Sequence, residues 1–236
     1  MIEDPPLLRI CRDLRRPAPD RLAQLRDAPT SHVVDAMYGQ GAVASSIRPV
    51  LGDEPRFCRF VGPAIPCACG PDDNLALLAA LAFAEPGDVL VVATGGWTNS
   101  AVLGDLVAGM AKNRGVVGLV TDGAVRDRTG LRAVGLPVFA AAVTPNSAAR
   151  NGPGTVGLPV VMGGVRVAAG DVVVADEDGV VVIPAERLAE VSERLAVVRA
   201  AEERLFAEVA DGLKEVTAIM DLLQSPRVHY VPKDAS

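Results

Sequence analysis

The sequence predicts an α/β fold in which helices cover buried strands, and three observations support this prediction. The chain has 236 residues, which is enough for one sizeable core and too few for two domains of typical size. Half of the residues are hydrophobic but only 3% are aromatic, so Val, Leu and Ala must build most of the core. Short β-branched runs alternate with stretches rich in Ala and Leu, which is typical of βαβ units. We therefore expect a single domain.

The amino-terminal segment differs in composition from the rest of the chain. Residues 1–30 are rich in Pro, Arg and Asp, and we interpret them as an arm on the surface with a short helix over residues 18–26. Ser31 is a helix-capping residue type that precedes an apolar run. A second helix is therefore expected to start there and to stop at Gly39 or Gly41.

The central part of the chain alternates strands and helices. Three β-branched runs, each bounded by Gly, Pro or Asp, predict buried strands at residues 60–65, 89–93 and 116–121. The Ala/Leu stretch 74–84 predicts a helix between the first two strands, and residues 103–113 predict a helix between the second and the third. This order is that of a parallel βαβ arrangement.

The second half of the chain changes to closely spaced strands. They are separated by glycine turns and are expected at residues 138–142, 159–161, 165–167, 172–176 and 179–183. Residues 185–212 follow as one long amphipathic helix that ends at a glycine. The predicted organisation is therefore an arm (1–30), a central domain ending in a long helix (31–212) and a tail (213–236) with weak signals.

Composition argues against several classes of function. The formal net charge is −6 and the basic residues are scattered, so no concentrated cationic surface is predicted for nucleic acid. There is no long uninterrupted apolar stretch for a membrane span, and the amino terminus is acidic and Pro-rich where a signal peptide is basic and then apolar. The four cysteines are too few for a disulfide scaffold. We expect a cytoplasmic protein that binds neither nucleic acid nor membrane.

The residues that suggest chemistry lie in two glycine-containing segments. The first is Gly95-Gly96-Trp97-Thr98-Asn99-Ser100 followed by Gly104-Asp105-Leu106, and the second is Asp122-Gly123-Ala124-Val125-Arg126-Asp127. A glycine turn lets backbone approach a ligand, and the free amides of a following helix attract an anion such as a carboxylate. The intervening helix and strand should return Arg126 and Asp127 to the start of that helix.

The charged residues of these segments suit an anionic ligand and a cation. The planar guanidinium of Arg126 matches a carboxylate or an enolate oxygen, and the carboxylates of Asp105 and Asp127 are hard donors suited to Mg²⁺ or Mn²⁺. An isolated Arg–Asp pair is more often a weak surface salt bridge, and that interpretation stays open from the residues alone.

The same segment resembles a known family. Residues 95–140 read GGWTNSAVLGDLVAGMAKNRGVVGLVTDGAVRDRTGLRAVGLPVFA, which is similar to the signature of the RraA-like superfamily, a group that includes 4-hydroxy-4-methyl-2-oxoglutarate aldolases and oxaloacetate decarboxylases. In catalytic members an Asp precedes the Arg-Asp pair by the spacing seen here between Asp105 and Arg126. The resemblance continues over most of the chain, in Asp35-Ala36-Met37, Gly62-Pro63-Ala64, Asp73-Asn74 and residues 163–184.

The resemblance implies roles for particular residues. It implies that Asp127 holds a divalent cation, Mg²⁺ or Mn²⁺, that Arg126 contacts the oxygen that becomes an enolate, and that Asp105 orders water near the cation. It also implies a substrate-binding set that comprises Gly104, Asp105, Leu106 and Val107 (the last two through their backbone amides), Arg126 and Asn74. A buried helix cap explains Asn74 equally well.

The resemblance further implies an assembly. The fold would be a swivelling β/β/α sandwich, with residues 31–212 as the catalytic domain and the chains joined as homotrimers or homohexamers. A glutamate on the long helix of a neighbouring subunit would complete the site, with Glu203 as the first choice and Glu202 as the second. The implied activity is that of a metal-dependent class II pyruvate aldolase acting on a small 2-oxo acid.

Two departures from the family pattern leave the substrate open. Pro66 stands where a Thr is usual, and Ala141 where an Arg is frequent. One alternative is therefore a metal enzyme of the same fold that acts on a different, biosynthetic 2-oxo acid. Another is a non-catalytic regulator that binds ribonuclease E, although such regulators characteristically lack the Asp that is present here as Asp127.

Overall fold

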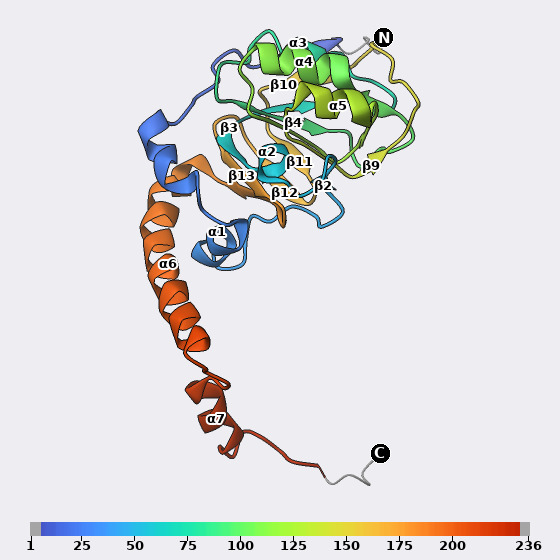
Figure 1. Cartoon of the computed structure of the whole chain (residues 1–236). Coiled ribbons are helices and arrows are strands. Elements are labelled where there is room, and N and C mark those ends of the chain that lie inside the picture. Colours follow the sequence, from blue (N-terminus) through green and yellow to red (C-terminus); the bar gives the residue numbers. More distant parts are fainter. Residues whose placement is uncertain (1–5, 232–236) are drawn as a thin grey trace, which may run out of the picture. The chain divides into compact units, whose positions relative to one another are not determined.

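The computed structural model describes residues 6–231, and the chain divides into two compact units that meet between Leu195 and Ala196. The first unit contains all of the strands in the described part of the chain (Figure 1). Its helices are α1 (Thr30–Ala36), α2 (Pro55–Cys58), α3 (Leu75–Ala80), α4 (Asp105–Asn113), α5 (Arg128–Val134) and the 3-10 helices η1 (Pro19–Leu25) and η2 (Ala185–Arg187). Helix α6 (Leu188–Ala210) begins in the first unit and continues in the second, which also contains α7 (Thr217–Leu223).

The main sheet has a parallel centre. Its order is β1-β10-β3-β4-β6-β8-β2, and β13 and β14 extend it from β3. Strands β3, β4, β6 and β8 are parallel to one another, whereas β13 pairs antiparallel with the first residues of β3. The bounds are β1 (Leu8–Ile10), β2 (Arg48–Pro49), β3 (Phe60–Ala68), β4 (Val89–Ala93), β6 (Gly118–Thr121), β8 (Val138–Ala140), β10 (Gly154–Val156), β13 (Val172–Asp176) and β14 (Gly179–Ile183).

Two smaller sheets complete the first unit. One is parallel and has the order β5-β7-β9, and the other is an antiparallel pair of β11 and β12. Their bounds are β5 (Ala101–Leu103), β7 (Ala124–Val125), β9 (Ala142–Val143), β11 (Val160–Met162) and β12 (Val165–Val167).

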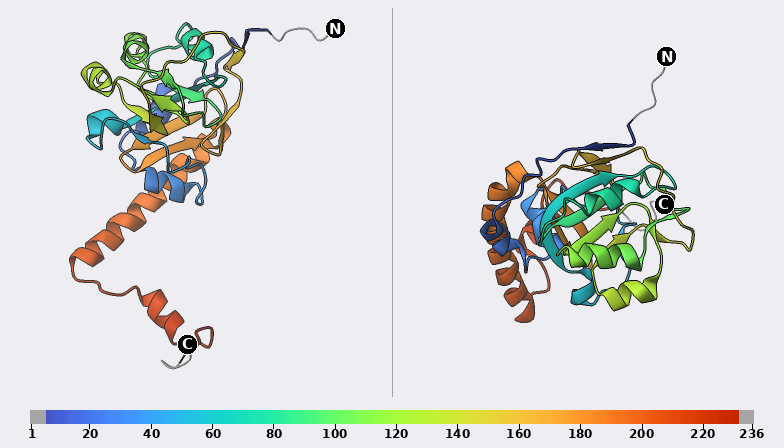
Figure 2. Two further views of the ribbon diagram at one scale, coloured as in Figure 1. Left: turned by 90° about the vertical axis from the view of Figure 1, so that its right-hand side faces the viewer. Right: turned by 90° about the horizontal axis from the view of Figure 1, so that it is seen from above.

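The side chains of β4 show how the layers are built. Leu90 and Val92 join the core beneath α3 and α4, whereas Val89 and Val91 join a second core shared with β11 and β13. Successive side chains of a strand point to opposite faces, so a strand covered on both sides is apolar throughout, as β4 is. Helices α3, α4 and α5 lie together over one face of the sheet (Figure 2). Helices, sheet and a second β layer form the β/β/α sandwich that the family resemblance implied.

Most strands lie where the sequence predicted them, and two central elements differ. Strands at residues 89–93, 165–167, 172–176 and 179–183 have the expected bounds. The helix expected from residue 103 begins at Asp105, because residues 101–103 pair with β7 as β5. The expected strand 138–142 is divided into β8 and β9, which belong to different sheets.

The prediction that Ser31 caps a helix is wrong. Helix α1 begins at Thr30, its N-cap residue is Pro29, and no side chain of the cap residue bonds to the helix. The carboxylate of Asp176 accepts hydrogen bonds from the Thr30 backbone N (2.7 Å) and from Thr30 Oγ1 (2.7 Å). The cap is therefore supplied by a residue 146 positions away, which a local sequence pattern cannot show.

The amino-terminal arm packs closely on the first unit. Strand β1 pairs with β10 at the edge of the main sheet, and residues 18–26, expected as a helix, form the 3-10 helix η1 with Leu22 and Leu25 buried. The guanidinium of Arg16 donates to both oxygens of Asp88, each at 2.8 Å. Only 1% of the Asp88 side chain is exposed, so this ion pair fixes the arm.

The second unit is helical and exposes apolar side chains. It holds most of α6 and the whole of α7. Of these two helices, α7 was not predicted from the sequence. Phe206, Val209 and Ile219 are more than half exposed in the unit. Across the described residues, no helix has both the length and the apolar character needed to cross a membrane.

Candidate active site

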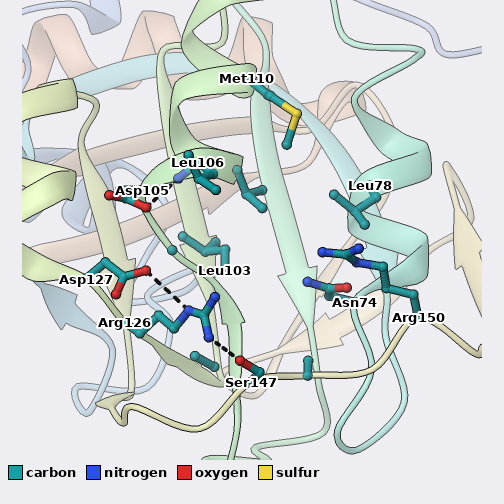
Figure 3. A pocket seen from close by; sticks show the side chains of 14 residues that line it. Asn74, Leu78, Leu103, Asp105, Leu106, Met110, Arg126, Asp127, Ser147 and Arg150 are labelled. Carbon is teal, nitrogen blue, oxygen red and sulfur yellow. Dashed lines mark hydrogen bonds and ion pairs between the residues drawn. The ribbon is translucent and has the colours of Figure 1, made fainter.

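The candidate site forms where two neighbouring strands end. Strand β5 leads into Gly104 and α4, and β7 leads into Arg126 and Asp127. The two strands are parallel, with Leu103 opposite Val125, so the residues that follow them lie side by side. A cavity of about 190 Å³ opens at this place, lined by both segments and by residues from α3 and the chain before β10 (Figure 3). The expected return of Arg126 and Asp127 to the start of α4 is confirmed.

Arg126 and Asp127 are held by local backbone geometry. The Arg126 backbone N donates to the carbonyl of Leu103 at 3.0 Å, which ties the two segments together. Asp127 has a left-handed backbone (φ 60°, ψ 45°) at the start of α5. Non-glycine residues rarely adopt this conformation, and those that do are concentrated at functional sites. Asp127 Oδ2 lies 3.2 Å from Arg126 Nε, and Arg126 Nη1 donates to Ser147 Oγ. The two charged groups are thus preset beside each other.

Two glycines make room for the carboxylates. A Cβ at Gly104 would lie 3.0 Å from Arg126 Cγ and closer still to Asp127 Oδ2. A Cβ at Gly130 would lie 2.7 Å from Asp105 Cβ and closer still to Asp105 Oδ2. Both positions exclude larger residues because the acidic side chains occupy the space.

The start of α4 offers fewer amides than the sequence suggested. Leu106 and Val107 both line the cavity. The Leu106 backbone N already donates to Asp105 Oδ1 at 2.7 Å. The amide of Val107 lies in the first turn of α4, where the helix itself supplies no acceptor. The carbonyl four residues earlier, that of Leu103, accepts a hydrogen bond from the Arg126 backbone N. Val107 is therefore the better placed of the two predicted anion donors.

The far wall of the cavity carries Asn74 and Arg150 (Figure 3). Asn74 is 8% exposed, and its Nδ2 donates to the carbonyl of Val102 at 3.1 Å. Its buried Oδ1 has no hydrogen-bond partner among the described residues. Asn74 was predicted from the sequence, whereas Arg150 and Ser147 were missed because neither lies in a motif. Only the fold brings the chain before β10 to this cavity.

The Gly95-Gly96 turn does not line the cavity, contrary to what its sequence suggested. The turn folds around Asp122, whose carboxylate accepts from the Thr94 backbone N at 2.6 Å and from the Gly96 backbone N at 3.1 Å. The ring nitrogen of Trp97 donates to Asp72 at 2.9 Å. The glycine that allows close approach at the cavity is Gly104, further along the chain.

Glu203 and Glu202 lie on the part of α6 that belongs to the second unit, and both are exposed. Neither lines the cavity that the first unit forms. Their role in catalysis stays a prediction that requires another copy of the chain.

The donors at the cavity fit a hard divalent cation that keeps part of its water shell. The carboxylates of Asp105 and Asp127 lie on the same side of the cavity (Figure 3). The described residues contain no group of three or more His, Cys, Asp or Glu side chains able to hold a metal ion, so further ligands would be water or substrate. Mg²⁺ commonly binds proteins through one or two carboxylates in this way. The chain thus places carboxylate oxygens of the kind that Mg²⁺ or Mn²⁺ prefers at the cavity.

The fold and the cavity define a β/β/α protein with a candidate ligand site where parallel strands end. A sequence model described as "RraA-like: Aldolase/RraA" matches residues 30–182. The chain belongs to this RraA-like family.

Comparison with individual proteins gives the same assignment. The chain is 34% identical to a protein of Halalkalibacterium halodurans named "Putative 4-hydroxy-4-methyl-2-oxoglutarate aldolase", over 88% of this chain and 97% of that one. It is similar in structure to RraAS2 of Streptomyces coelicolor, described as an unusual member of the RNase ES inhibitor RraA family (TM-score 0.71, 27% identity, 83% of this chain and 100% of that chain). It also resembles the RNA-processing inhibitor RraA of Thermus thermophilis (TM-score 0.59, 34% identity, 67% and 93%). Similar proteins thus carry names of both enzymes and inhibitors.

Proposed function

We propose that this protein is a divalent-metal-dependent carbon–carbon lyase that releases pyruvate from a 4-hydroxy-2-oxo acid such as 4-hydroxy-4-methyl-2-oxoglutarate and that also decarboxylates oxaloacetate. The observation that carries the proposal is the Arg126–Asp127 pair, held against Gly104 beside the first turn of α4. The name of the relative from Halalkalibacterium halodurans supports the same reaction class.

Both reactions break the bond between C3 and C4 of a 2-oxo acid and leave the electron pair on the pyruvyl fragment as an enolate. The guanidinium of Arg126 would donate to the enolate oxygen, and the Val107 amide would bind the C1 carboxylate with help from the helix dipole. A divalent cation held by Asp127, with Asp105 nearby, would act as a Lewis acid when bound. Loss of one such contact typically lowers turnover by on the order of 100-fold.

The far wall suits a substrate with a second carboxylate and a hydroxyl. The side chain of Arg150 lines the cavity across from Arg126 and makes no ion pair with any residue of the described part (Figure 3). The buried Asn74 Oδ1 needs a donor, which a 4-hydroxyl group would provide. We therefore expect Arg150→Ala to raise KM for dicarboxylate substrates much more than it lowers kcat.

The proposal includes an assembly in which a glutamate from a second copy of the chain completes the site. Glu203, with Glu202 as the alternative, would reach the site from the long helix of a neighbouring chain in a homotrimer or homohexamer. Mixing inactive Glu203→Gln with inactive Arg126→Ala chains should restore part of the activity, because some sites would then receive both wild-type residues. No restoration, although the two chains exchange, would contradict the shared site.

The test is pyruvate release from oxaloacetate and from 4-hydroxy-4-methyl-2-oxoglutarate, with Mg²⁺ or Mn²⁺ and then with excess EDTA. Asp127→Asn is the informative variant because Asn tolerates the left-handed backbone while removing the charge. Arg126→Ala is paired with Arg128→Ala, an exposed arginine outside the cavity. Activity that requires metal, Arg126 and Asp127 but not Arg128 supports the proposal.

Two other results would each point elsewhere. Metal binding without turnover of either compound would favour a different 2-oxo acid as substrate. The absence of both metal binding and turnover, together with inhibition of a ribonuclease E, would favour a regulator, the kind of protein that two of the similar structures are named for.

A further inference from the structure

A second and larger cavity lies at the opposite end of the parallel strands. Its volume is about 870 Å³, within the range of small-molecule sites. Its lining includes residues just before or at the start of β3, β4, β6 and β8, whereas the candidate active site follows the carboxyl ends of strands. The two cavities share no lining residue.

One wall of this cavity is the amino-terminal arm, and it is firmly seated. Arg16 Nη2 donates to the carbonyl of Phe83 at 3.0 Å in addition to the pair with Asp88. Positions Gly157 and Gly170 of the main body face the arm so closely that a Cβ at either would collide with it. The wall is therefore a built part of the first unit.

The lining combines an apolar floor with cationic groups. The floor contains Phe60, Val61, Pro63, Val117 and Pro137. Four arginines and two acidic residues line the cavity: Arg16, Arg26, Arg56, Arg59, Glu85 and Asp88.

Not all of these arginines are available to a ligand. Arg16 is committed to Asp88 and Glu85, Arg56 to Glu54, and Arg59 to Glu177.

Arg26 is the available cation. Its guanidinium forms no ion pair or hydrogen bond with another residue among 6–231, and the residue is exposed and lines the cavity. The Nη1 of Arg59 is also left over, because its pair with Glu177 uses Nε and Nη2. The cavity therefore combines an apolar floor with guanidinium N–H groups that have no partner within the described residues. This combination is complementary to an anion that has a flat apolar body.

We propose that this cavity binds a small organic anion of the aryl carboxylate class, with the ring on the floor near Phe60 and the carboxylate at Arg26 and Arg59. The proposal is independent of the lyase reaction. It assigns the arm a function, namely to form one wall of a second ligand site and to supply its anion-binding arginine.

The test uses 2-naphthoate as the probe and 2-naphthylmethanol as its uncharged counterpart. Calorimetry measures the binding of each compound to the full-length protein. We expect saturable binding of the acid and at least tenfold weaker binding of the alcohol. Arg26→Glu should weaken naphthoate binding by about 10-fold or more, the scale of a charge-assisted hydrogen bond. Arg21→Glu is the matched control, because Arg21 lies on the 3-10 helix η1 that Arg26 follows, is exposed and is absent from the lining. It should change affinity less than twofold.

A second variant tests the space instead of the charge. Ala18→Trp places a ring into the cavity from the arm and should abolish binding while circular dichroism stays unchanged. Equal weakening by Arg21→Glu and Arg26→Glu would overturn the proposal, as would loss of binding in Arg126→Ala, which would place the probe in the other cavity. A change in oligomeric mass on Ala18→Trp would also overturn it and identify the cavity as a contact between copies of the chain.

Discussion

Substituting Gly104 by Ala tests the candidate site without removing any charged group. The backbone of Gly104 is extended (φ −139°), so Ala is compatible with it and no backbone strain is introduced. The added Cβ would lie 3.0 Å from Arg126 Cγ and nearer to Asp127 Oδ2, whereas ordinary contact begins at 3.4 Å. The Asp127 carboxylate would have to move by on the order of 1 Å, and a misplacement of that size commonly costs about 100-fold in rate.

The effect on stability should be small. The Arg126–Asp127 ion pair is 38% and 44% exposed, so its contribution to the free energy of unfolding is at most about 1 kcal/mol. A change of that size shifts Tm by about 2–4 °C in a protein of this length. We expect kcat/KM for pyruvate release to fall about 100-fold in Gly104→Ala, equivalent to about 2.7 kcal/mol of transition-state stabilisation, while Tm stays within that interval.

Gly109→Ala is the matched control, because Gly109 lies in the middle of α4, the helix that Gly104 precedes. The nearest atom to its added Cβ is Val134 Cγ2 at 3.9 Å, which is ordinary contact. Replacing a glycine inside a helix by Ala gains about 1 kcal/mol, so Tm should rise and activity should stay unchanged. Full activity in Gly104→Ala would refute the assignment of Asp127, and so would an activity loss shared equally by Gly109→Ala.

Three further predictions concern Gly130, Arg16 and Cys58. Gly130→Ala should lower kcat/KM because its Cβ would displace Asp105, although Ala favours helix α5; unchanged turnover would exclude Asp105 from the site. Arg16→Met leaves the buried Asp88 without its cation and should lower the free energy of unfolding by about 3 kcal/mol at pH 7 in urea titrations; an unchanged midpoint would contradict the stabilising role of the pair. Burial raises the pKa of the Cys58 thiol to about 11, so alkylation by iodoacetamide at pH 8 should be slow, should accelerate as pH rises and should become fast in urea; mass spectrometry of the Cys58 peptide checks this.

The layers of the fold could be predicted from the sequence because their signals are local. The apolar run of β4 is buried on both faces and was located with its bounds, as were β13 and β14, whose turn is marked by Asp178 and by Gly179 at the start of β14. The two-residue strands β2 and β7 were missed, since they are too short to show an alternation. Their pairing is decided by the longer strands around them.

The candidate site was predictable only in part, for a related reason. The Arg126–Asp127 segment and the start of α4 are marked by glycines and charges close together in sequence, whereas Arg150 has no such surroundings. It reaches the cavity because the chain before β10 is led past α3 by the pairing of β10 with β1 and β3. A lone arginine in a loop carries no local signal that distinguishes it from a solvated one.

Glycines show the limit most clearly. Gly95 and Gly96 have positive φ and form a conspicuous turn, yet they pack around Asp122 and do not line the cavity. Gly104 has an ordinary extended backbone, so nothing in its own conformation requires glycine. The requirement comes from Asp127, which occupies the space of its missing side chain. A glycine that makes room for a neighbouring side chain and a glycine that bends the chain are therefore told apart by their neighbours in space, which sequence spacing alone does not give.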